Sequence, residues 1–432
     1  MAASDKVTEQ ILFDDIMPLP FRVLTLVLIG IGLWLMLNIG CYWYQVNMLQ
    51  LLNLSYSSNN YTQLDHGNIS ATGEYATTIT PDFQDNLLLI KGIWQNFRNI
   101  FAITSLSWTI FKFVQWKYID NSDVDSSISL MKLVYYLIPL VAIIYLGYIL
   151  FIGLSTPSFG QYRMYTTIKR VLIGGINSKT MRSNDILISD TLMSYSKVIN
   201  DFGLFVWIYY INDKYNPSIE MIILTIPTFI RIKQCWYEFR LTNQKQHLFN
   251  LLKYVSGLLP LIINYLIKIT IIDQPANLLD KLHHLNNWWV FFSFFNSSYS
   301  LFWDIKMDWG FHFFDKIFNK SNKFLISRPK NKLVFGNEIF YCIIILIDFC
   351  LRFIWILKLF IIKEEESKGK LTYINKFSTF LFGYDAYSLG YFLIELFEIL
   401  RRWMWCFIKL ENDWIKLQTS ATQIEMIDIK TS

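Results

Sequence analysis

The chain has 432 residues, of which 53% are hydrophobic, 17% aromatic and only 17% charged. A soluble globular domain carries about 25% charged residues, so this composition excludes an ordinary soluble protein. The formal net charge of +5 is modest and carries little information apart from its distribution along the chain.

The apolar residues gather in runs that are long enough to cross a bilayer, which takes about 20 residues in a helix. Each run should be an α-helix, because lipid cannot satisfy an exposed backbone. The sequence therefore predicts an all-α polytopic membrane protein with about nine transmembrane helices. The predicted spans are 21–44, 89–113, 133–154, 186–211, 218–239, 248–272, 286–303, 338–362 and 377–400.

The basic residues concentrate in loops 155–185 and 304–336 and near the C-terminal end, whereas the N-terminal segment and residues 364–366 are acidic. The positive-inside rule places the basic loops and the C-terminus in the cytosol. With about nine spans, the N-terminus is then lumenal or extracellular.

Three glycosylation sequons, at Asn53, Asn60 and Asn68, favour a different orientation of loop 45–88. Sequons that are used would place this loop outside the cytosol. The loop has no Lys or Arg of its own to indicate a side. We follow the charge pattern of the whole chain and expect the three asparagines to be unmodified.

Several arginines lie within or close to the apolar runs: Arg231, Arg352, Arg401 and Arg402. A charge in the bilayer costs roughly 2.5–3.5 kcal/mol on insertion scales, and such residues usually face an ion or substrate path. A guanidinium matches phosphate or carboxylate oxygens. The pattern therefore indicates a path for an anion.

The segment 188–201 carries polar residues at a helical repeat. Asp190, Ser194, Lys197 and Asp201 return to nearly the same angle on one helix. We expect Lys197 and Asp201 to face a cavity. Asp190 stands nearer the cytosolic end, where a charge can also reach the membrane surface.

Arg231 follows Pro227, which can kink the helix and loosen its backbone hydrogen bonds. The alternative is an interfacial anchor, together with Lys233 and Gln234. The next span begins with Lys253 and Tyr254, which add further donors.

Asp348 and Arg352 are four residues apart and can pair along one helix face, with Trp355 one turn further. This pair either is structural or also receives a ligand oxygen.

Asp304 and Asp308 share a face if their helix continues, between Trp303 and Trp309. Tryptophans at the end of a span are typical of an interfacial belt, which is the alternative for this segment.

The last cluster of charges contains Glu395, Glu398, Arg401 and Arg402, with Glu398 four residues before Arg402. The five cysteines and five histidines lack metal-type spacing, and no phosphate-binding loop, nucleophile elbow or dinucleotide motif is present. We therefore expect neither an enzyme nor a cofactor or metal.

Taken in chain order, these motifs resemble the EXS-domain family, the membrane module of eukaryotic phosphate exporters. The resemblance covers roughly residues 160–415. The matching segments are 189–197, 226–227 with 231–235, 253–254, 303–309, 351–355, 398–405 and 410–412.

The resemblance implies a short lumenal tail (1–20), N-terminal transmembrane helices (21–160), an EXS domain (161–415) and a cytosolic tail (416–432). It also implies a phosphate path lined by Asp190, Arg231, Lys253, Tyr254, Asp304, Arg352, Trp355, Arg401 and Arg402. We expect supporting roles for Lys197, Asp201, Asp308, Asp348 and Glu398.

Two departures from the family pattern stand out. Exporters of this family usually carry a long N-terminal SPX domain that senses inositol pyrophosphates, whereas only about twenty residues precede the first span here. The family often has paired arginines where this chain has Tyr237 and Glu238, which affects the expected cytosolic phosphate contacts.

Short members without an SPX domain are found in the fungal Golgi. The resemblance to them implies return of phosphate from the Golgi lumen to the cytosol, in support of glycosylation and of the retention of lumenal ER proteins. The alternative is a sorting adaptor for recycling Golgi enzymes, without transport activity. Expected partners are inorganic phosphate, membrane lipid, cytosolic adaptors and a second copy in a homodimer, but no nucleic acid.

Overall fold

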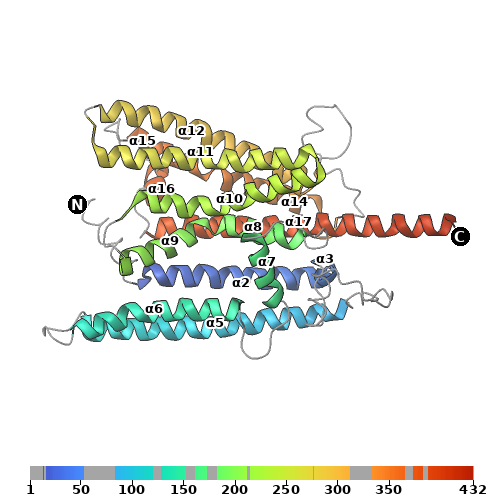
Figure 1. Ribbon diagram of the computed structural model, residues 1–432, viewed down its shortest axis with the longest axis horizontal. Helices are drawn as coiled ribbons and strands as arrows, with labels where there is room; N and C mark the ends of the chain where they lie inside the picture. Colours follow the sequence, from blue (N-terminus) through green and yellow to red (C-terminus); the bar gives the residue numbers. More distant parts are fainter. Residues whose placement is uncertain are drawn as a thin grey trace. The chain divides into compact units, whose positions relative to one another are not determined.

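The computed structural model describes residues 13, 16–52, 83–119, 128–151, 161–172, 182–211, 215–275, 277–311, 333–364, 373–382 and 388–431. Within these ranges every regular element is a helix and no strand occurs (Figure 1). The all-α prediction is confirmed. The sequons at Asn53, Asn60 and Asn68 lie outside the described residues.

The chain forms two compact units. The first contains Met1–Val27 and Ser189–Trp405, and the second contains Leu28–Ile188 and Cys406–Ser432. The boundaries between them fall within three helices, which are α2 (Leu19–Trp43), α8 (Arg182–Ser194) and α17 (Leu389–Thr431).

In the second unit, α5 (Asn86–Val114) packs along α6 (Ile128–Phe151), which also contacts α7 (Gln161–Leu172). The short helix α3 (Met48–Leu51) is joined to the start of α5 through side-chain amides, since Asn86 Nδ2 donates to Asn47 Oδ1 at 3.1 Å. A buried ion pair of 2.6 Å between Arg170 and Asp185 joins α7 to α8.

The first unit holds a series of packed helices: α9 (Ser196–Val206), α10 (Pro217–Thr242), α11 (Lys245–Asp273), α12 (Leu278–Trp303) and α14 (Glu338–Arg352). Each of these helices packs against the next one in this order. A side chain at Gly203 of α9 would collide with Ile223 of α10, so glycine permits their close approach. The same unit contains α15 (Leu357–Glu364), which packs on α16 (Tyr373–Phe382).

Three of the predicted spans consist of more than one helix. Segment 186–211 breaks at Tyr195 between α8 and α9 and ends in a π-helical turn, η4 (Trp207–Ile211). Segment 338–362 is interrupted after Arg352 by a 3₁₀ turn, η7 (Ile354–Ile356). Segment 377–400 belongs to α16 and α17.

Three described segments are long and apolar enough to cross a membrane: Leu19–Trp43, Lys245–Asp273 and Glu338–Ile361. The predicted count of about nine spans is therefore not confirmed. The stretch Leu137–Leu150 of α6 is also apolar but shorter, and several other long helices carry more polar residues. In α10, for example, Glu220, Arg231 and Lys233 interrupt the apolar sequence.

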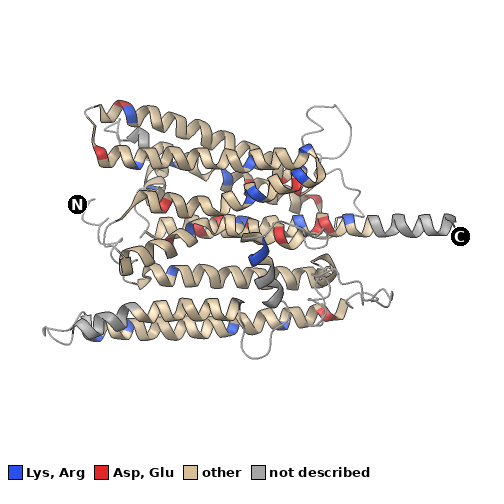
Figure 2. Cartoon of the chain, viewed as in Figure 1, with Lys and Arg blue, Asp and Glu red and all other residues tan. Residues whose placement is uncertain are grey.

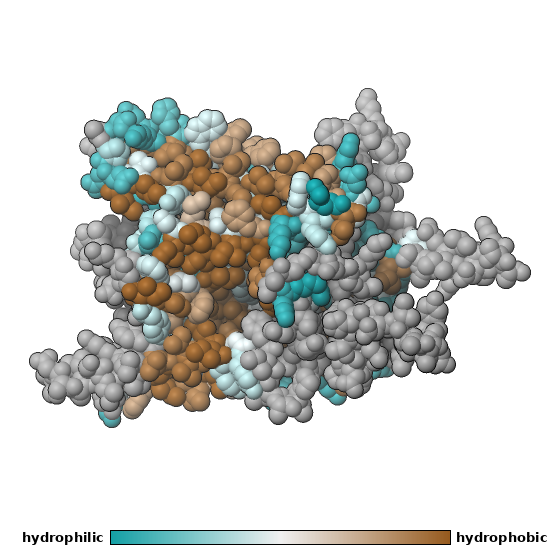
Figure 3. All heavy atoms as spheres, in the orientation of Figure 1, coloured by the Kyte–Doolittle hydropathy of each residue, from teal (hydrophilic) through white to brown (hydrophobic). Residues whose placement is uncertain are grey.

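The surface of α11 and α12 is largely apolar in Figure 3, where hydrophilic residues gather at the end at which the two helices connect (upper left). Aromatic side chains on α12, including Trp288, Phe291, Phe294 and Phe295, are about half exposed. Large apolar side chains that face outward suit a lipid environment.

Candidate functional site

Charged residues occur along α8, α10, α14 and α17 (Figure 2), and several of their side chains are buried. Asp190, Arg231, Asp304, Asp348 and Arg401 are each at most 5% exposed. Charged groups are rarely this deeply buried unless they are paired. All of them belong to the first compact unit.

Arg231 of α10 is the centre of one half of the cluster. Its Nε lies 2.9 Å from Asp190 Oδ1 of α8, and its Nη2 donates to the hydroxyl of Tyr254 of α11 at 2.6 Å. Its Nη1 donates to Ser189 Oγ at 2.9 Å and to Gln234 Oε1 at 2.8 Å. All three guanidinium nitrogens thus face polar groups from three helices.

Tyr254 closes this arrangement, because its hydroxyl also donates to Asp190 Oδ1 at 3.0 Å. The guanidinium of Arg231 lies over the ring of Tyr254, 4.7 Å from its centroid. Lys253 Nζ lies 4.6 Å from the same ring centroid and 5.4 Å from that of Trp303. The charge of Lys253 is therefore next to the cluster, with aromatic faces around it.

Arg352 and Arg401 form the other half. Arg352 Nη2 contacts Asp304, and its Nε donates to Asp348 Oδ2 at 3.1 Å. Arg401 Nη1 lies 3.3 Å from Asp348 Oδ1 and 3.8 Å from Asp304 Oδ2. Two arginines from α14 and α17 thus share the same two carboxylates.

Glu398 and Ser194 join the two halves. Arg401 binds Glu398 through two nitrogens, at 2.5 and 2.9 Å. Ser194 donates to Glu398 Oε1 at 3.0 Å and accepts from Arg402 Nε at 2.9 Å. Arg402 Nη1 in turn lies 3.9 Å from Asp190 Oδ2. We call this connected set the charged cluster, made of Asp190, Arg231, Tyr254, Asp304, Asp348, Arg352, Glu398, Arg401 and Arg402.

The backbone around Asp304 and Arg352 departs from the α-helix. Asp304 begins a π-helical turn, η5 (Asp304–Asp308), and Arg352 ends α14 just before the 3₁₀ turn. π turns inside helices are frequent at functional sites. Both local irregularities therefore coincide with residues of the cluster.

Trp355 is held beside the cluster by a serine. Its indole Nε1 donates to Ser297 Oγ at 3.0 Å, and the same hydroxyl donates to the carbonyl of Arg352 at 3.0 Å. The ring of Trp355 also meets Trp289 of α12 edge to face, with centroids 5.6 Å apart. These contacts fix the indole next to the end of α14.

The burial of these residues argues against the interfacial alternatives that the sequence left open for them. Asp190 and Arg231 are buried and paired, so neither reaches out to a surface. Gln234, expected as an anchor at the interface, is 5% exposed and binds Arg231. Trp303 and Trp309 are buried within the protein rather than exposed as a belt.

The polar stripe expected on one helix is divided. Because the helix is interrupted at Tyr195, Asp190 and Ser194 belong to α8, where both bind arginines of the charged cluster. Lys197 and Asp201 belong to α9, where the charged residues acting on Asp201 include Glu395 and Arg22. Lys197 lies over the ring of Tyr391.

Asp308 is placed one turn after Asp304 and is partly buried. Its charge acts on that of Lys253, which lies over the ring of Tyr254. Both residues therefore lie at the edge of the cluster.

Sequence reasoning missed the uncharged ligands of the arginines. Ser189, Gln234 and Ser297 all contact or orient cluster residues. For Gln234 the signal was available, because it lies three residues after Arg231 and shares its helix face. Ser189 and Ser297 carry no comparable signal, since serine is common in such helices.

The cluster is a balanced salt of guanidinium and carboxylate groups. The carboxylate oxygens occupy the places around the guanidinium groups at which the oxygens of an incoming oxyanion would bind. Glu398 is its most accessible carboxylate, with 36% of its side chain exposed, whereas Asp304, Asp348 and Asp190 are nearly inaccessible. An anion would therefore meet the cluster first at Glu398 and Arg401.

Comparison with protein families matches residues 17–415 to the EXS family. Among curated proteins, Protein ERD1 of Kluyveromyces lactis is 27% identical over 391 residues, which cover 84% of this chain and 89% of that protein. Protein ERD1 of Saccharomyces cerevisiae is 28% identical over 246 residues, covering 57% of this chain but only 59% of the relative.

A more distant relative is Solute carrier family 53 member 1 of Mus musculus. It is 28% identical over 204 residues, which cover 46% of this chain and 25% of that protein. The similarity therefore extends to a quarter of this much longer protein.

Proposed function

Since the chain belongs to the EXS family, we propose that it is a membrane transporter or channel that moves inorganic phosphate from the Golgi lumen to the cytosol. The observation that carries this proposal is the charged cluster, in which four arginines from α10, α14 and α17 converge. Buried arginines of this kind are costly in a membrane protein unless they serve a polar path.

The cluster suits an oxyanion that binds and then leaves. Phosphate offers oxygens in the geometry that guanidinium groups bind in pairs. Conduction also requires release, so attraction must be tempered. Asp190, Asp304 and Asp348 provide that balance, because each can take back an arginine when the phosphate departs.

We propose that the phosphate exchanges with these carboxylates stepwise. It first displaces Glu398 from Arg401, at the accessible side of the cluster. It then competes with Asp348 and Asp304 for Arg352. No step makes or breaks a covalent bond, and no cofactor takes part.

The proposed location and physiological role rest on the likeness to the short fungal members of the family. Sugar transfer from nucleotide sugars in the lumen, followed by nucleotide hydrolysis, leaves phosphate that cannot cross lipid. A phosphate path would remove this product, and so support glycosylation and the retention of lumenal ER proteins. The name of the mouse relative, a solute carrier, is consistent with transport.

The alternative, a sorting adaptor, depends mainly on the basic loop 304–336, of which residues 312–332 lie outside the described part of the chain. An adaptor would have no use for buried arginine–carboxylate pairs such as Arg231–Asp190. The charged cluster therefore favours transport.

The test is the flux of radiolabelled phosphate into liposomes that contain the purified protein. We expect flux above that of empty liposomes, and its loss in Arg231→Gln. The matched control is Arg240→Gln, because Arg240 lies on the same helix but is exposed. Wild-type liposomes without flux, or equal loss in both variants, would overturn the proposal.

A further inference from the structure

Two buried carboxylates lie outside the charged cluster, Asp201 on α9 and Glu395 on α17, and each is 1% exposed. In the part of the chain that the structure describes, none of their four oxygens has a hydrogen-bond partner. We call them the acid pair. A buried ionised carboxylate without such a partner is strongly disfavoured, so this arrangement needs an explanation.

The charges around the acid pair come from several helices. Asp201 interacts electrostatically with two carboxylates, Glu395 and Glu220, and with two cations, Arg22 and Lys197. The same two cations interact electrostatically with Glu395. The half-buried phenol of Tyr391 also lies within reach of the charges of Asp201, Glu395 and Glu220. Two cations thus balance the acid pair at a distance, without donating a hydrogen bond to it.

Both cations have contacts with groups outside the acid pair. Lys197 Nζ lies 5.5 Å from the ring centroid of Tyr391. Arg22 Nε donates to the carbonyl of Met17 at 2.8 Å, and its guanidinium lies over Phe13. The carboxyl oxygens therefore lack the hydrogen-bond donors that two ionised carboxylates require. A proton on one of the two carboxyl groups would supply a donor, and it would also remove one of the two negative charges.

The acid pair is connected to the charged cluster through Lys197. The charged neighbours of Lys197 are Glu395, Glu398 and Asp201, and Glu398 is the carboxylate that holds Arg401. Lys197 is thus shared between the acid pair and the first carboxylate that an entering anion would displace. A change on one side alters the charge balance on the other.

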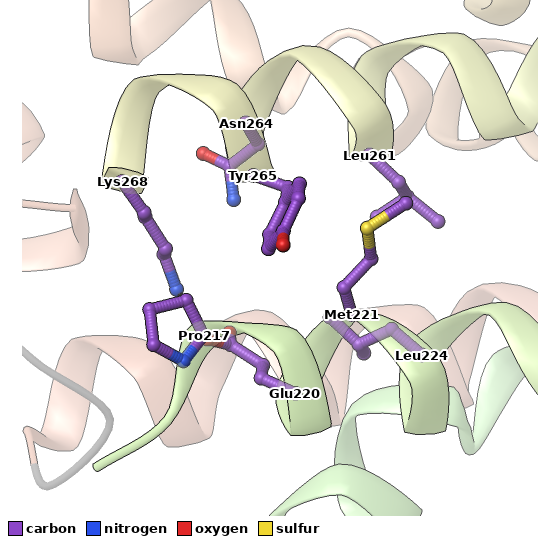
Figure 4. Close-up of a pocket in the computed structure, with 8 residues that line it drawn as sticks. All are labelled: Pro217, Glu220, Met221, Leu224, Leu261, Asn264, Tyr265 and Lys268. Carbon is purple, nitrogen blue, oxygen red and sulfur yellow. Dashed lines mark hydrogen bonds and ion pairs between the residues drawn. The ribbon is translucent and has the colours of Figure 1, made fainter. Parts of the chain in front are cut away.

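The acid pair also has a neighbour at the surface. Glu220, which acts on Asp201, lines the pocket of Figure 4 between α10 and α11, where it forms a 2.6 Å ion pair with Lys268. The side chain of Lys268 is 33% exposed and that of Glu220 is 14% exposed. A partly exposed carboxylate thus lies within electrostatic reach of the acid pair.

We propose that Asp201 and Glu395 form a proton-binding site whose occupancy is coupled to phosphate in the charged cluster. This inference rests on the proposed phosphate function. When phosphate displaces Glu398 from Arg401, the freed carboxylate draws Lys197 towards it. The acid pair then loses positive charge and binds its proton more tightly. The linkage is reciprocal, so a proton on the acid pair raises the affinity for phosphate.

The proton site can be tested without any transport measurement. Infrared spectra of the purified protein near neutral pH should contain a band of a protonated carboxyl group. The band should disappear in a variant with both Asp201→Asn and Glu395→Gln, and remain in Asp280→Asn, where an exposed carboxyl of α12 is changed. Absence of the band, or its persistence in the double variant, would overturn the proton site.

The coupling is tested with phosphate in the same preparation. Wild-type phosphate affinity should fall as the pH rises through the titration of the site, by the roughly 5- to 150-fold typical of such coupling. The double variant should lose the part of this dependence that exceeds the titration of phosphate itself. An identical pH dependence in wild type and variant would overturn the coupling.

Three controls separate the remaining outcomes. Thermal unfolding must show that the double variant is folded, because removal of both carboxylates leaves Lys197 and Arg22 without these counter-charges; if it is not folded, Glu395→Gln alone takes its place. Replacement of Na⁺ by choline should change nothing, and a strict need for Na⁺ would assign the acid pair to a metal cation instead. Wild-type protein that shows the band but no flux would refute the proposed function and the coupling while leaving the proton site.

Discussion

Arg231 and Asp190 meet at 2.9 Å across α10 and α8, and the hydroxyl of Tyr254 bonds to both of them. The phenol therefore fixes the geometry of the ion pair from a third helix. A phosphate that replaces Asp190 on Arg231 would find the guanidinium already oriented, which lowers the cost of binding.

This relationship makes Tyr254→Phe informative. A hydrogen bond to a charged group contributes about 1.5–3 kcal/mol, so the melting temperature should fall. The phosphate affinity should fall by about tenfold, which corresponds to roughly 1.4 kcal/mol. The control is Tyr265→Phe on the same helix, whose hydroxyl has an exposed contact with Ser218. Unchanged affinity in Tyr254→Phe would show that the phenol plays no part in binding.

Arg352→Lys tests whether the fork of the guanidinium is required. Arg352 reaches Asp304 and Asp348 through two different nitrogens, which the single ammonium of lysine cannot do with the same geometry. We expect phosphate flux to fall by about tenfold or more in liposomes, while the protein still folds and localises. Arg240→Lys is the exposed control. Flux at the wild-type level in Arg352→Lys would show that only the positive charge of Arg352 is needed, and not the shape of its guanidinium group.

Asp304→Asn tests whether this carboxylate weakens the attraction of the arginines for phosphate. The carboxylate contacts Arg352 and lies 3.8 Å from Arg401 Nη1, so its neutralisation leaves both arginines freer to hold phosphate. We expect tighter binding and slower release, with the half-saturating concentration and the maximal flux both reduced severalfold. Asp280→Asn serves as the control, and a variant with weaker binding would contradict this reading.

The same variant separates transport from sorting in cells. If phosphate flux supports retention, cells with Asp304→Asn should secrete lumenal ER proteins and underglycosylate their cargo. Loss of reconstituted flux together with normal retention and glycosylation would place the adaptor function first.

Topology provides an independent prediction. A tag at the C-terminus should be digested by protease in sealed Golgi vesicles, because the positive-inside rule places that end in the cytosol. Deglycosidase treatment should leave the electrophoretic mobility unchanged. A shift that maps to Asn53, Asn60 or Asn68 would invert the orientation of loop 45–88.

The helices themselves could be predicted, because apolar runs of this length have few other stable conformations. Pairs within one helix were also accessible, and Asp348–Arg352 forms as its spacing predicts. Glu398 shows the limit of such spacing. It lies four residues before Arg402, yet it bonds directly to Arg401, three residues away, and contacts Arg402 only through Ser194.

Ion pairs between residues on different helices could not be predicted from the sequence. Nothing in a helical period tells which helix will lie beside another, so the meeting of Arg352 with Asp304 required the fold. The break at Tyr195 had the same effect, because it separated Asp190 from Asp201 although their spacing placed them on one face. A local departure from the helix changes every angle that follows it.

Arg401 and Arg402 are adjacent in sequence, yet Arg401 contacts Asp348 and Arg402 approaches Asp190. Successive residues of an α-helix point about 100° apart. The two arginines of α17 can therefore reach both halves of the cluster only at one rotation of the helix about its axis. A single residue inserted between Glu398 and Arg401 would turn both arginines away from their carboxylates at once. The length of this segment is therefore under a constraint that no substitution within it would reveal.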